Sequence, residues 1–325
     1  MADSEKEFHR TVLLKETIEA LNIKKGDVII DATLGAGGHA LEILRLIGER
    51  GKLIAFDVDK KAVDDFKKRI TENFPELRNR LIPVVDNFKN IKKVVKRLQA
   101  EGRIKRDKVN GVLADLGWRI EQVADERYGM SFRKEMPLKM NFSGDDKVLT
   151  AEKVVNEWSE EELRNIFQSL GEEREAGRIA KKIVESRQKE RIVTTTQLAD
   201  LITDAKKNRN GRIHPATKVF QALRIVVNAE LSNLELFLEG ATDVLESEGR
   251  LVVISFHSLE DRTVKKFFRA KARGCVCPEE LPVCVCGQSN QFIILQKKGV
   301  RPSLAELKEN PRARSAVLRI LKKRK

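Results

Sequence analysis

The chain has 325 residues, enough for one large domain or two ordinary ones, and 41% of them are hydrophobic, so a substantial core can form. Its 63 Lys and Arg outnumber 49 Asp and Glu, and the formal net charge of +14 favours a polyanionic partner such as nucleic acid. With no run of 18 apolar residues and no hydrophobic signal region, we expect neither a membrane span nor secretion, but a cytoplasmic protein with reduced cysteines.

The first half of the chain alternates short apolar runs with helical patterns. Four runs, each closing on an aspartate, are found at 28–30, 53–56, 81–85 and 109–114. Strands in repeated βα units form a parallel sheet with helices on both faces, and ligands bind at the carboxyl ends of the strands. We therefore expect a ligand site at that edge, beside Asp31, Asp57, Asp86 and Asp115. Pro83 in the third run predicts an edge strand or an irregularity.

The pattern changes after the fourth run. Residues 119–149 lack regular periodicity, and the charged segment 150–207 has helical spacing with capping-box residues at two helix starts. We interpret 119–215 as a helical insertion that recognises RNA or substrate. The α/β core is then formed by 1–118 and 216–325.

The last third returns to the α/β pattern. Two apolar-striped helices are expected at 217–231 and 233–246, followed by a buried fifth strand at 251–256. The segments 292–296 and 316–321 have the composition of closing strands. The predicted fold is therefore a Rossmann-like α/β sheet that is interrupted once by helices.

A loop before the closing strands holds all four cysteines: Cys275, Cys277, Cys284 and Cys286. Four thiolates this close could hold zinc, but the single residue within each pair is tighter than the usual two. Zinc, free thiols and disulfides therefore all stay open. We expect no catalytic role for this loop.

A glycine-rich segment between the first strand and its helix predicts a nucleotide site. Gly35, Gly37 and Gly38 let the backbone approach a ligand closely, and the helix that follows directs its N-terminus at that ligand. Asp57 ends the next strand, where an acid accepts hydrogen bonds from both ribose hydroxyls.

Two nucleotide cofactors are compatible with this pattern. The spacing Gly-x-Gly-x-x-Ala also matches the dinucleotide fingerprint, so an NAD-dependent oxidoreductase is one alternative. S-adenosylmethionine is favoured because it has no pyrophosphate and uses acids at several strand ends. Asp31 would lie near its amino-acid part, Asp57 at the ribose and residues 86–88 at the adenine. A dehydrogenase would also need a His or Lys where Asp115 lies.

Six sequence blocks, in order along nearly the whole chain, resemble the bacterial ribosomal RNA small subunit methyltransferase H family, also called MraW. They are Thr-x-Gly-x-Gly-Gly-His (33–39), Asp-Leu-Gly (115–117), Ser-Phe-Arg (131–133), Ala-Thr-Lys-Val-Phe-Gln-Ala-Leu-Arg-Ile (216–225), Ser-Phe-His-Ser-Leu-Glu-Asp-Arg (255–262) and Asn-Pro-Arg-Ala-Arg-Ser (310–315).

This resemblance implies a class I (Rossmann-like) S-adenosylmethionine-dependent methyltransferase core with an inserted helical domain. The implied reaction is methylation of the N4 amine of a cytidine in the decoding centre of 16S rRNA, within the small ribosomal subunit. A homodimer stays open. The cofactor contacts that the resemblance implies are Gly37, Gly38, His39, Asp57, Phe88, Asp115 and Gln122.

The chain departs from the family pattern between 118 and 143, where the target base is expected to be held. Trp118 stands where the family has Val or Ile, and Lys139 and Ser143 stand where it has Asp. The cofactor motifs are intact. A non-catalytic ribosome-assembly factor that kept the cofactor site is therefore a further alternative.

Three residues are the candidate catalytic groups. The lone pair of an exocyclic cytosine amine is delocalised into the ring, so an acceptor for its N–H and in-line positioning should help. Asp115 would accept that bond or orient the cofactor. Trp118 would stack on an extruded base or pack in the core. His257 would remove a proton, contact a phosphate or be a buried, hydrogen-bonded histidine.

Basic residues outside these motifs are candidate phosphate contacts. They are Lys206, Lys207, Arg209, Arg212, Lys218, Arg224, Arg262, Arg312 and Arg314, with Lys322, Lys323 and Arg324 near the C-terminus.

Overall fold

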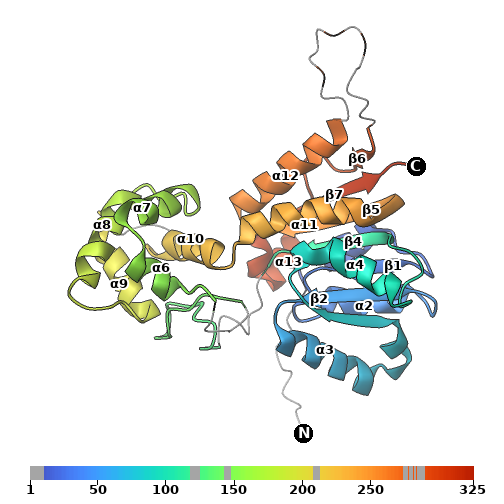
Figure 1. Ribbon diagram of the computed structural model, residues 1–325, viewed down its shortest axis with the longest axis horizontal. Helices are drawn as coiled ribbons and strands as arrows, with labels where there is room; N and C mark the ends of the chain where they lie inside the picture. Colours follow the sequence, from blue (N-terminus) through green and yellow to red (C-terminus); the bar gives the residue numbers. More distant parts are fainter. Residues whose placement is uncertain are drawn as a thin grey trace. The chain divides into compact units, whose positions relative to one another are not determined.

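The computed structural model in Figure 1 describes most of the chain. The described residues are 11–117, 125–142, 148–207, 213–273, 277, 281, 283 and 290–325, without the side chain of Arg312. The chain divides into two compact units. Met1–Trp118 and Asn233–Lys325 form the α/β unit, and Arg119–Ser232 form the helical unit.

The α/β unit is built on a seven-stranded sheet with the order β3-β2-β1-β4-β5-β7-β6. Its strands are β1 (Val28–Asp31), β2 (Lys52–Asp57), β3 (Leu81–Val85), β4 (Val109–Asp115), β5 (Leu245–Ser255), β6 (Phe292–Ile294) and β7 (Val317–Lys323). The first five pair in parallel, whereas β7 pairs antiparallel with both β5 and β6. The expected Rossmann-like α/β fold is confirmed, and Pro83 lies in β3 at an edge of the sheet.

Helices cover both faces of this sheet (Figure 1). Successive strand side chains point to opposite faces, so Ile29 and Ile30 enter different cores. One core packs against α1 (Leu14–Leu21), α2 (Gly38–Leu46) and α3 (Lys60–Asn73). The other packs against α4 (Ile91–Ala100), α11 (Glu230–Val244) and α12 (Ser258–Arg273). The shorter elements are η1 (Pro75–Arg80), η2 (Phe88–Asn90), α13 (Leu304–Glu309) and η3 (Pro311–Ser315).

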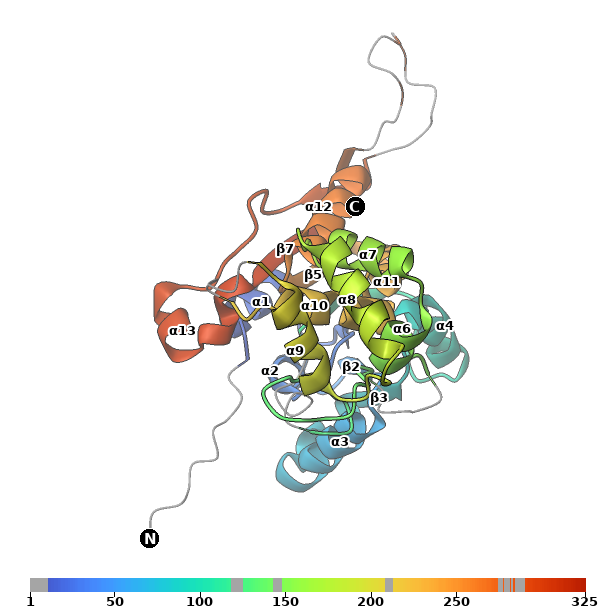
Figure 2. The ribbon, with the colours of Figure 1, turned by 90° about the vertical axis from the view of Figure 1, so that its left-hand side faces the viewer.

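The helical unit, whose helices Figure 2 shows, has a hydrophobic core of its own. Its helices are α6 (Ala151–Glu157), α7 (Glu160–Ser169), α8 (Ala176–Arg187), α9 (Thr195–Ala205) and α10 (Thr217–Val227). Capping boxes open α7 at Ser159 and α9 at Thr194, as their sequences predict. The division from the α/β unit falls after Ser232, not at 215/216 as expected from the sequence. The reason is that α10 buries Val219 and Leu223 in the core of the helical unit.

None of the described helices combines enough length with enough apolar character to cross a bilayer.

Candidate functional site

The strand order brings four acids to one edge of the sheet. Asp31, Asp57 and Asp115 are the last residues of β1, β2 and β4, and Asp86 follows β3 directly. These four strands are neighbours and run parallel. The chain moves outward from β1 through β2 to β3 and then returns to place β4 on the other side of β1. Ligands bind at such a switch point in open α/β sheets.

The glycine-rich loop between β1 and α2 is tied to the end of β2. The backbone N–H of Leu34 donates to the carbonyl oxygen of Phe56 (2.7 Å), and that of Gly35 donates to Oδ2 of Asp57 (3.0 Å). Gly37 is the N-cap of α2 at φ 75°, in the left-handed region. A Cβ added to Gly37 would lie 2.2 Å from a ring carbon of Phe66. Glycine is therefore required here by both backbone conformation and space.

Phe66 and Arg69 of α3 support this loop, and neither was predicted as a site residue from the sequence. Nη2 of Arg69 donates to the carbonyl oxygen of Gly37 (3.2 Å), and its guanidinium carbon lies 5.0 Å from the centroid of the Phe66 ring. Partial burial lowers the pKa of Arg69. The available signal was the spacing of the two residues, because positions i and i+3 share one face of a helix.

Asp31 is a buried acid, with 1% of its surface exposed. Its Oδ1 accepts a hydrogen bond from the backbone N–H of Thr33 (3.1 Å). The pKa of Asp31 is raised to about 7, mainly by burial; the bond from Thr33 opposes this rise, and the charges of Asp115 and Asp57 add to it. A cationic ligand would compensate this carboxylate.

Asp115 is held in place by three neighbours. Its backbone N–H donates to Oγ1 of Thr33 (2.6 Å), its Oδ1 accepts from the N–H of Gly117 (3.4 Å), and its Oδ2 lies 3.7 Å from Nδ1 of His39. The pKa of Asp115 is raised to about 7, mainly by burial; the bond from Gly117 opposes this rise, and the charge of Glu260 contributes to it. The side chain keeps 22% of its surface exposed, so a ligand can still reach it.

The other two strand-end acids have backbone donors. Besides Gly35, Asp57 accepts from the N–H of Asp59 at Oδ1 (2.9 Å). Oδ1 of Asp86 accepts from the N–H of Asn87 (2.7 Å) and from Nδ2 of Asn90 (2.8 Å), so it holds the start of η2. Phe88, in η2, packs edge-on against Phe237 of α11, with ring centroids 5.0 Å apart.

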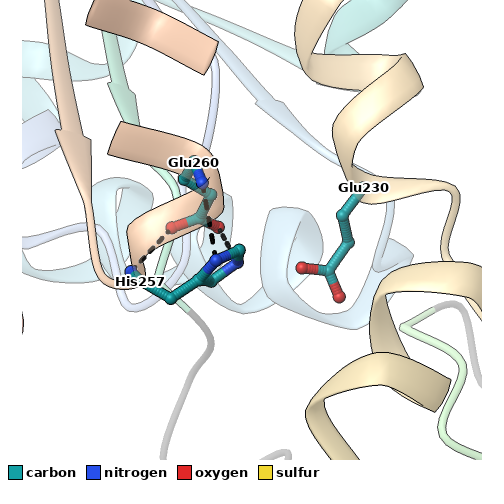
Figure 3. A group of neighbouring side chains, drawn as sticks. All are labelled: Glu230, His257 and Glu260. Carbon is teal, nitrogen blue, oxygen red and sulfur yellow. Dashed lines mark hydrogen bonds and ion pairs between the residues drawn. The ribbon is translucent and has the colours of Figure 1, made fainter. Parts of the chain in front are cut away.

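His257 follows β5 and is held by Glu260 (Figure 3). Nε2 of His257 lies 3.1 Å from Oε1 of Glu260, and Oε2 accepts from the backbone N–H of Phe256 (2.8 Å). Glu260 is only 3% exposed, and its charge acts on Asp115. No role was predicted for Glu260 from the sequence, although this residue lies in the block 255–262. Glu230, drawn in the same figure, accepts from Arg224 at 2.8 and 3.0 Å.

Several candidate phosphate contacts form bonds inside the helical unit. Nζ of Lys206 pairs with Oε2 of Glu173 (2.7 Å), and Nζ of Lys218 donates to the carbonyl oxygen of Glu172 (2.8 Å). Arg224 pairs with Glu230 as described. Of the described members of the set, Lys207, Arg262, Arg314 and Arg324 are exposed.

Some predicted site residues lie outside the described part of the chain. They are Trp118, Gln122, Arg209, Arg212, Cys275, Cys284, Cys286 and the side chain of Arg312. The roles assigned to them, including the zinc site with Cys277, stay predictions.

Comparison with known proteins gives consistent matches over nearly the full length. A model of the MraW methylase family matches residues 6–324. The ribosomal RNA small subunit methyltransferase H of Halothermothrix orenii is 45% identical over 315 residues, 96% of this chain and 97% of its own. The protein of the same name from Carboxydothermus hydrogenoformans is 46% identical over 316 residues, 97% of each chain. Among solved structures, an rRNA methylase from Streptococcus thermophilus covers 98% of this chain and 99% of its own at 11% identity, with a TM-score of 0.39.

Proposed function

This chain belongs to the MraW methylase family and uses S-adenosylmethionine as its methyl donor, and from that premise we propose that it methylates the N4 amine of a cytidine in the decoding centre of 16S rRNA. The α/β unit is a class I methyltransferase core. The observation that carries the proposal is the meeting of the glycine-rich loop with three strand-end acids, in a chain that matches the family from residue 6 to 324.

The residues at the sheet edge are suited to this cofactor. Asp31 and Asp115 are desolvated acids that a cationic ligand would compensate, and Asp57 is oriented by Gly35 to accept from hydroxyl groups. When bound, S-adenosylmethionine supplies an electrophilic methyl group on its sulfonium centre. The residues proposed to hold it are Asp31, Gly35, Gly37, Gly38, His39, Asp57, Phe88, Asp115 and Gln122.

Asp115 is proposed to accept the N–H of the target amine. An ionised acceptor draws that proton toward itself and helps localise the nitrogen lone pair, which ring conjugation otherwise spreads. Bonds to Thr33 and Gly117 orient the carboxylate before the substrate binds, so little reorganisation is needed during the reaction. Its partial exposure leaves room for the amine.

His257 is proposed to take up the proton that the methylated amine releases. Support comes from the Glu260 carboxylate, which holds the imidazole and also acts electrostatically on Asp115. A negative partner stabilises the imidazolium that forms when the ring takes a proton. Trp118 is proposed to stack on the target base, which is taken out of its helical stack for the reaction.

The test is methyl transfer from labelled S-adenosylmethionine to 30S particles, followed by digestion of the rRNA to nucleosides. We expect label in N4-methylcytidine, and label in another nucleoside would contradict the proposed target. Cofactor binding without transfer would instead favour the assembly-factor alternative. The match to a methylase family favours methyl transfer over the NAD-dependent alternative.

A further inference from the structure

Helix α4 has one apolar face and one face that carries several cations and no acid. Its sequence is IKKVVKRLQA, and the residues that face the sheet, Ile91, Val94, Val95 and Leu98, are at most 1% exposed. The outward side chains are basic or neutral, and the helix contains no acid. The apolar face accounts for folding of the helix, whereas the outward face needs a separate explanation.

The same charge continues on both sides of the helix. Residues 89–108 contain nine Lys or Arg and two acids. Lys89 before α4 and Arg103, Lys105 and Arg106 after it are all exposed. At the far end, Nζ of Lys108 donates to the backbone oxygen of Asp243, and Nζ of Lys323 in β7 donates to that of Leu245. The cations of this segment therefore continue to the C-terminal strand.

Much of the positive charge of residues 89–108 is not paired with an acid in the described part of the chain. Lys92 pairs with Asp243, Arg97 with Glu101 and Arg106 with Glu246. Among the described residues, five exposed cations of this segment have no acidic side-chain oxygen within 4.0 Å: Lys89, Lys93, Lys96, Arg103 and Lys105. The half-buried Lys108 donates to the backbone oxygen of Asp243 instead. We name the five exposed residues the α4 basic face.

Helix α3, on the opposite face of the sheet, shows that cations without an acidic partner are not a general feature of helices in the α/β unit. Its Lys60, Lys61 and Lys68 each pair with an acid four residues later. Such pairs stabilise a helix, whereas like charges four residues apart, as at Lys93 and Arg97 of α4, destabilise it. The chain thus keeps repulsive charges on α4, and a bound polyanion would neutralise them.

We propose that the α4 basic face binds the phosphate backbone of the RNA substrate, away from the nucleotide that is methylated. The identity of the polyanion rests on the proposed function. Helix α4 begins just after β3, at the edge that carries the strand-end acids, and runs about 15 Å toward the opposite edge, where β4 begins. RNA that reaches the strand-end acids can therefore continue along it. Phosphate contacts of this kind position the RNA without reading its sequence.

The experiment compares two triple variants of the full chain. K93Q/K96Q/K105Q removes three charges from the α4 basic face, and K61Q/K67Q/K68Q removes three exposed charges from α3. Binding to 16S rRNA is measured over a range of salt concentrations, and KM and kcat are measured with 30S particles. Cofactor affinity and melting temperature serve as controls for the fold.

The α4 variant should lower the slope of log K against log salt by about two to three, at roughly 0.7–0.9 per lost phosphate contact. Its KM for 30S particles should rise while kcat is retained, and the α3 variant should behave like the wild type. Equal slopes in the wild type and both variants would overturn the inference. An equal decrease of the slope in the two variants would overturn it as well. Binding to anionic phospholipid vesicles is measured for the same three proteins. If the α4 variant loses vesicle binding but keeps the RNA-binding slope of the wild type, the inference is also overturned. If the wild type binds 16S rRNA but does not methylate it, the proposed function is contradicted. The salt dependence of binding then still tests whether the α4 basic face contacts RNA phosphates.

Discussion

The two units of this molecule differ sharply in charge. The α/β unit contains 42 Lys and Arg against 30 Asp and Glu, a surplus of 12, whereas the helical unit contains 21 against 19, a surplus of 2. From the sequence, RNA recognition was expected in the helical insertion. The charge that attracts a polyanion instead belongs mostly to the α/β unit, so charge alone does not assign phosphate binding to the insertion.

The buried acids of the two units differ in a related way. In the helical unit, burial acts to raise the pKa of Glu173, but hydrogen bonds from Lys206 and from the backbone of Glu175 bring it below its usual value. In the α/β unit, the pKa values of Asp31 and Asp115 are raised to about 7. A buried acid whose charge is balanced by a cation stabilises the fold. A buried acid with a raised pKa instead indicates a site for a ligand or for chemistry.

The strongest test of this contrast is Asp115→Asn. If the carboxylate accepts the N–H of the target amine, kcat for methylation of 30S particles should fall by about 100-fold or more. The neutral amide has nearly the same shape, so the melting temperature should not fall. Wild-type kcat in this variant would remove Asp115 from the chemistry.

The contrast is sharpened by matched substitutions of one buried acid in each unit. Asp31→Asn should weaken S-adenosylmethionine binding by at least tenfold, because a charge-assisted bond of about 1.5–3 kcal/mol is lost. Glu173→Gln should leave cofactor binding unchanged and lower the free energy of unfolding by about 1–3 kcal/mol, because Lys206 loses its partner. Calorimetry measures the cofactor affinity of both variants, and denaturant titration measures their free energies of unfolding. Weaker cofactor binding in Glu173→Gln with unchanged binding in Asp31→Asn would contradict the comparison.

Cofactor affinity should depend on pH through the two raised acids. An acid with a pKa of about 7 is mostly protonated at pH 6 and mostly ionised at pH 8, and only the ionised form attracts a cation. Affinity for S-adenosylmethionine should therefore rise between pH 6 and 8, by up to about tenfold for each acid. A flat profile by calorimetry would show that the cation contacts neither acid.

The same shift has the opposite effect on the stability of the free protein. The folded-state pKa of Asp31 lies above the unfolded value of about 3.9, so the folded state binds the proton more tightly. The stabilisation that Asp31 contributes is fully present below its unfolded pKa of about 3.9 and is lost as pH rises through its folded pKa of about 7. Asp31→Asn should thus raise the free energy of unfolding at pH 8 and change it little at pH 4.

The smallest expected effect belongs to Arg69, which supports the glycine-rich loop from α3. Arg69→Ala removes its bond to Gly37 and its contact with Phe66, at a cost of about 1 kcal/mol. Affinity for S-adenosylmethionine should fall by a few fold. Lys68→Ala, on the exposed side of the same helix, is the control and should leave affinity unchanged. Equal effects of the two substitutions would exclude a specific support of the loop by Arg69.

The sequence by itself predicted most strands of this protein and the residues proposed for its cofactor site. Apolar runs closing on aspartates predicted β1 to β4, and the glycine-rich segment predicted the loop before α2. The capping boxes at Ser159 and Thr194 marked two helix starts. These features depend on residues only a few positions apart, so periodicity and composition are enough to detect them.

Only the tertiary structure decided how these elements act together. It paired β7 antiparallel with β5, grouped α10 with the helical unit, and brought Arg69 to Gly37 and Glu260 to His257. The raised pKa values of Asp31 and Asp115 and the pairing of Lys206 with Glu173 also emerged there. So did the cations of the α4 basic face that have no acidic partner among the described residues. The physical reason is that burial and electrostatic pairing depend mainly on groups far apart in the chain. Local sequence patterns do not record which of those groups meet.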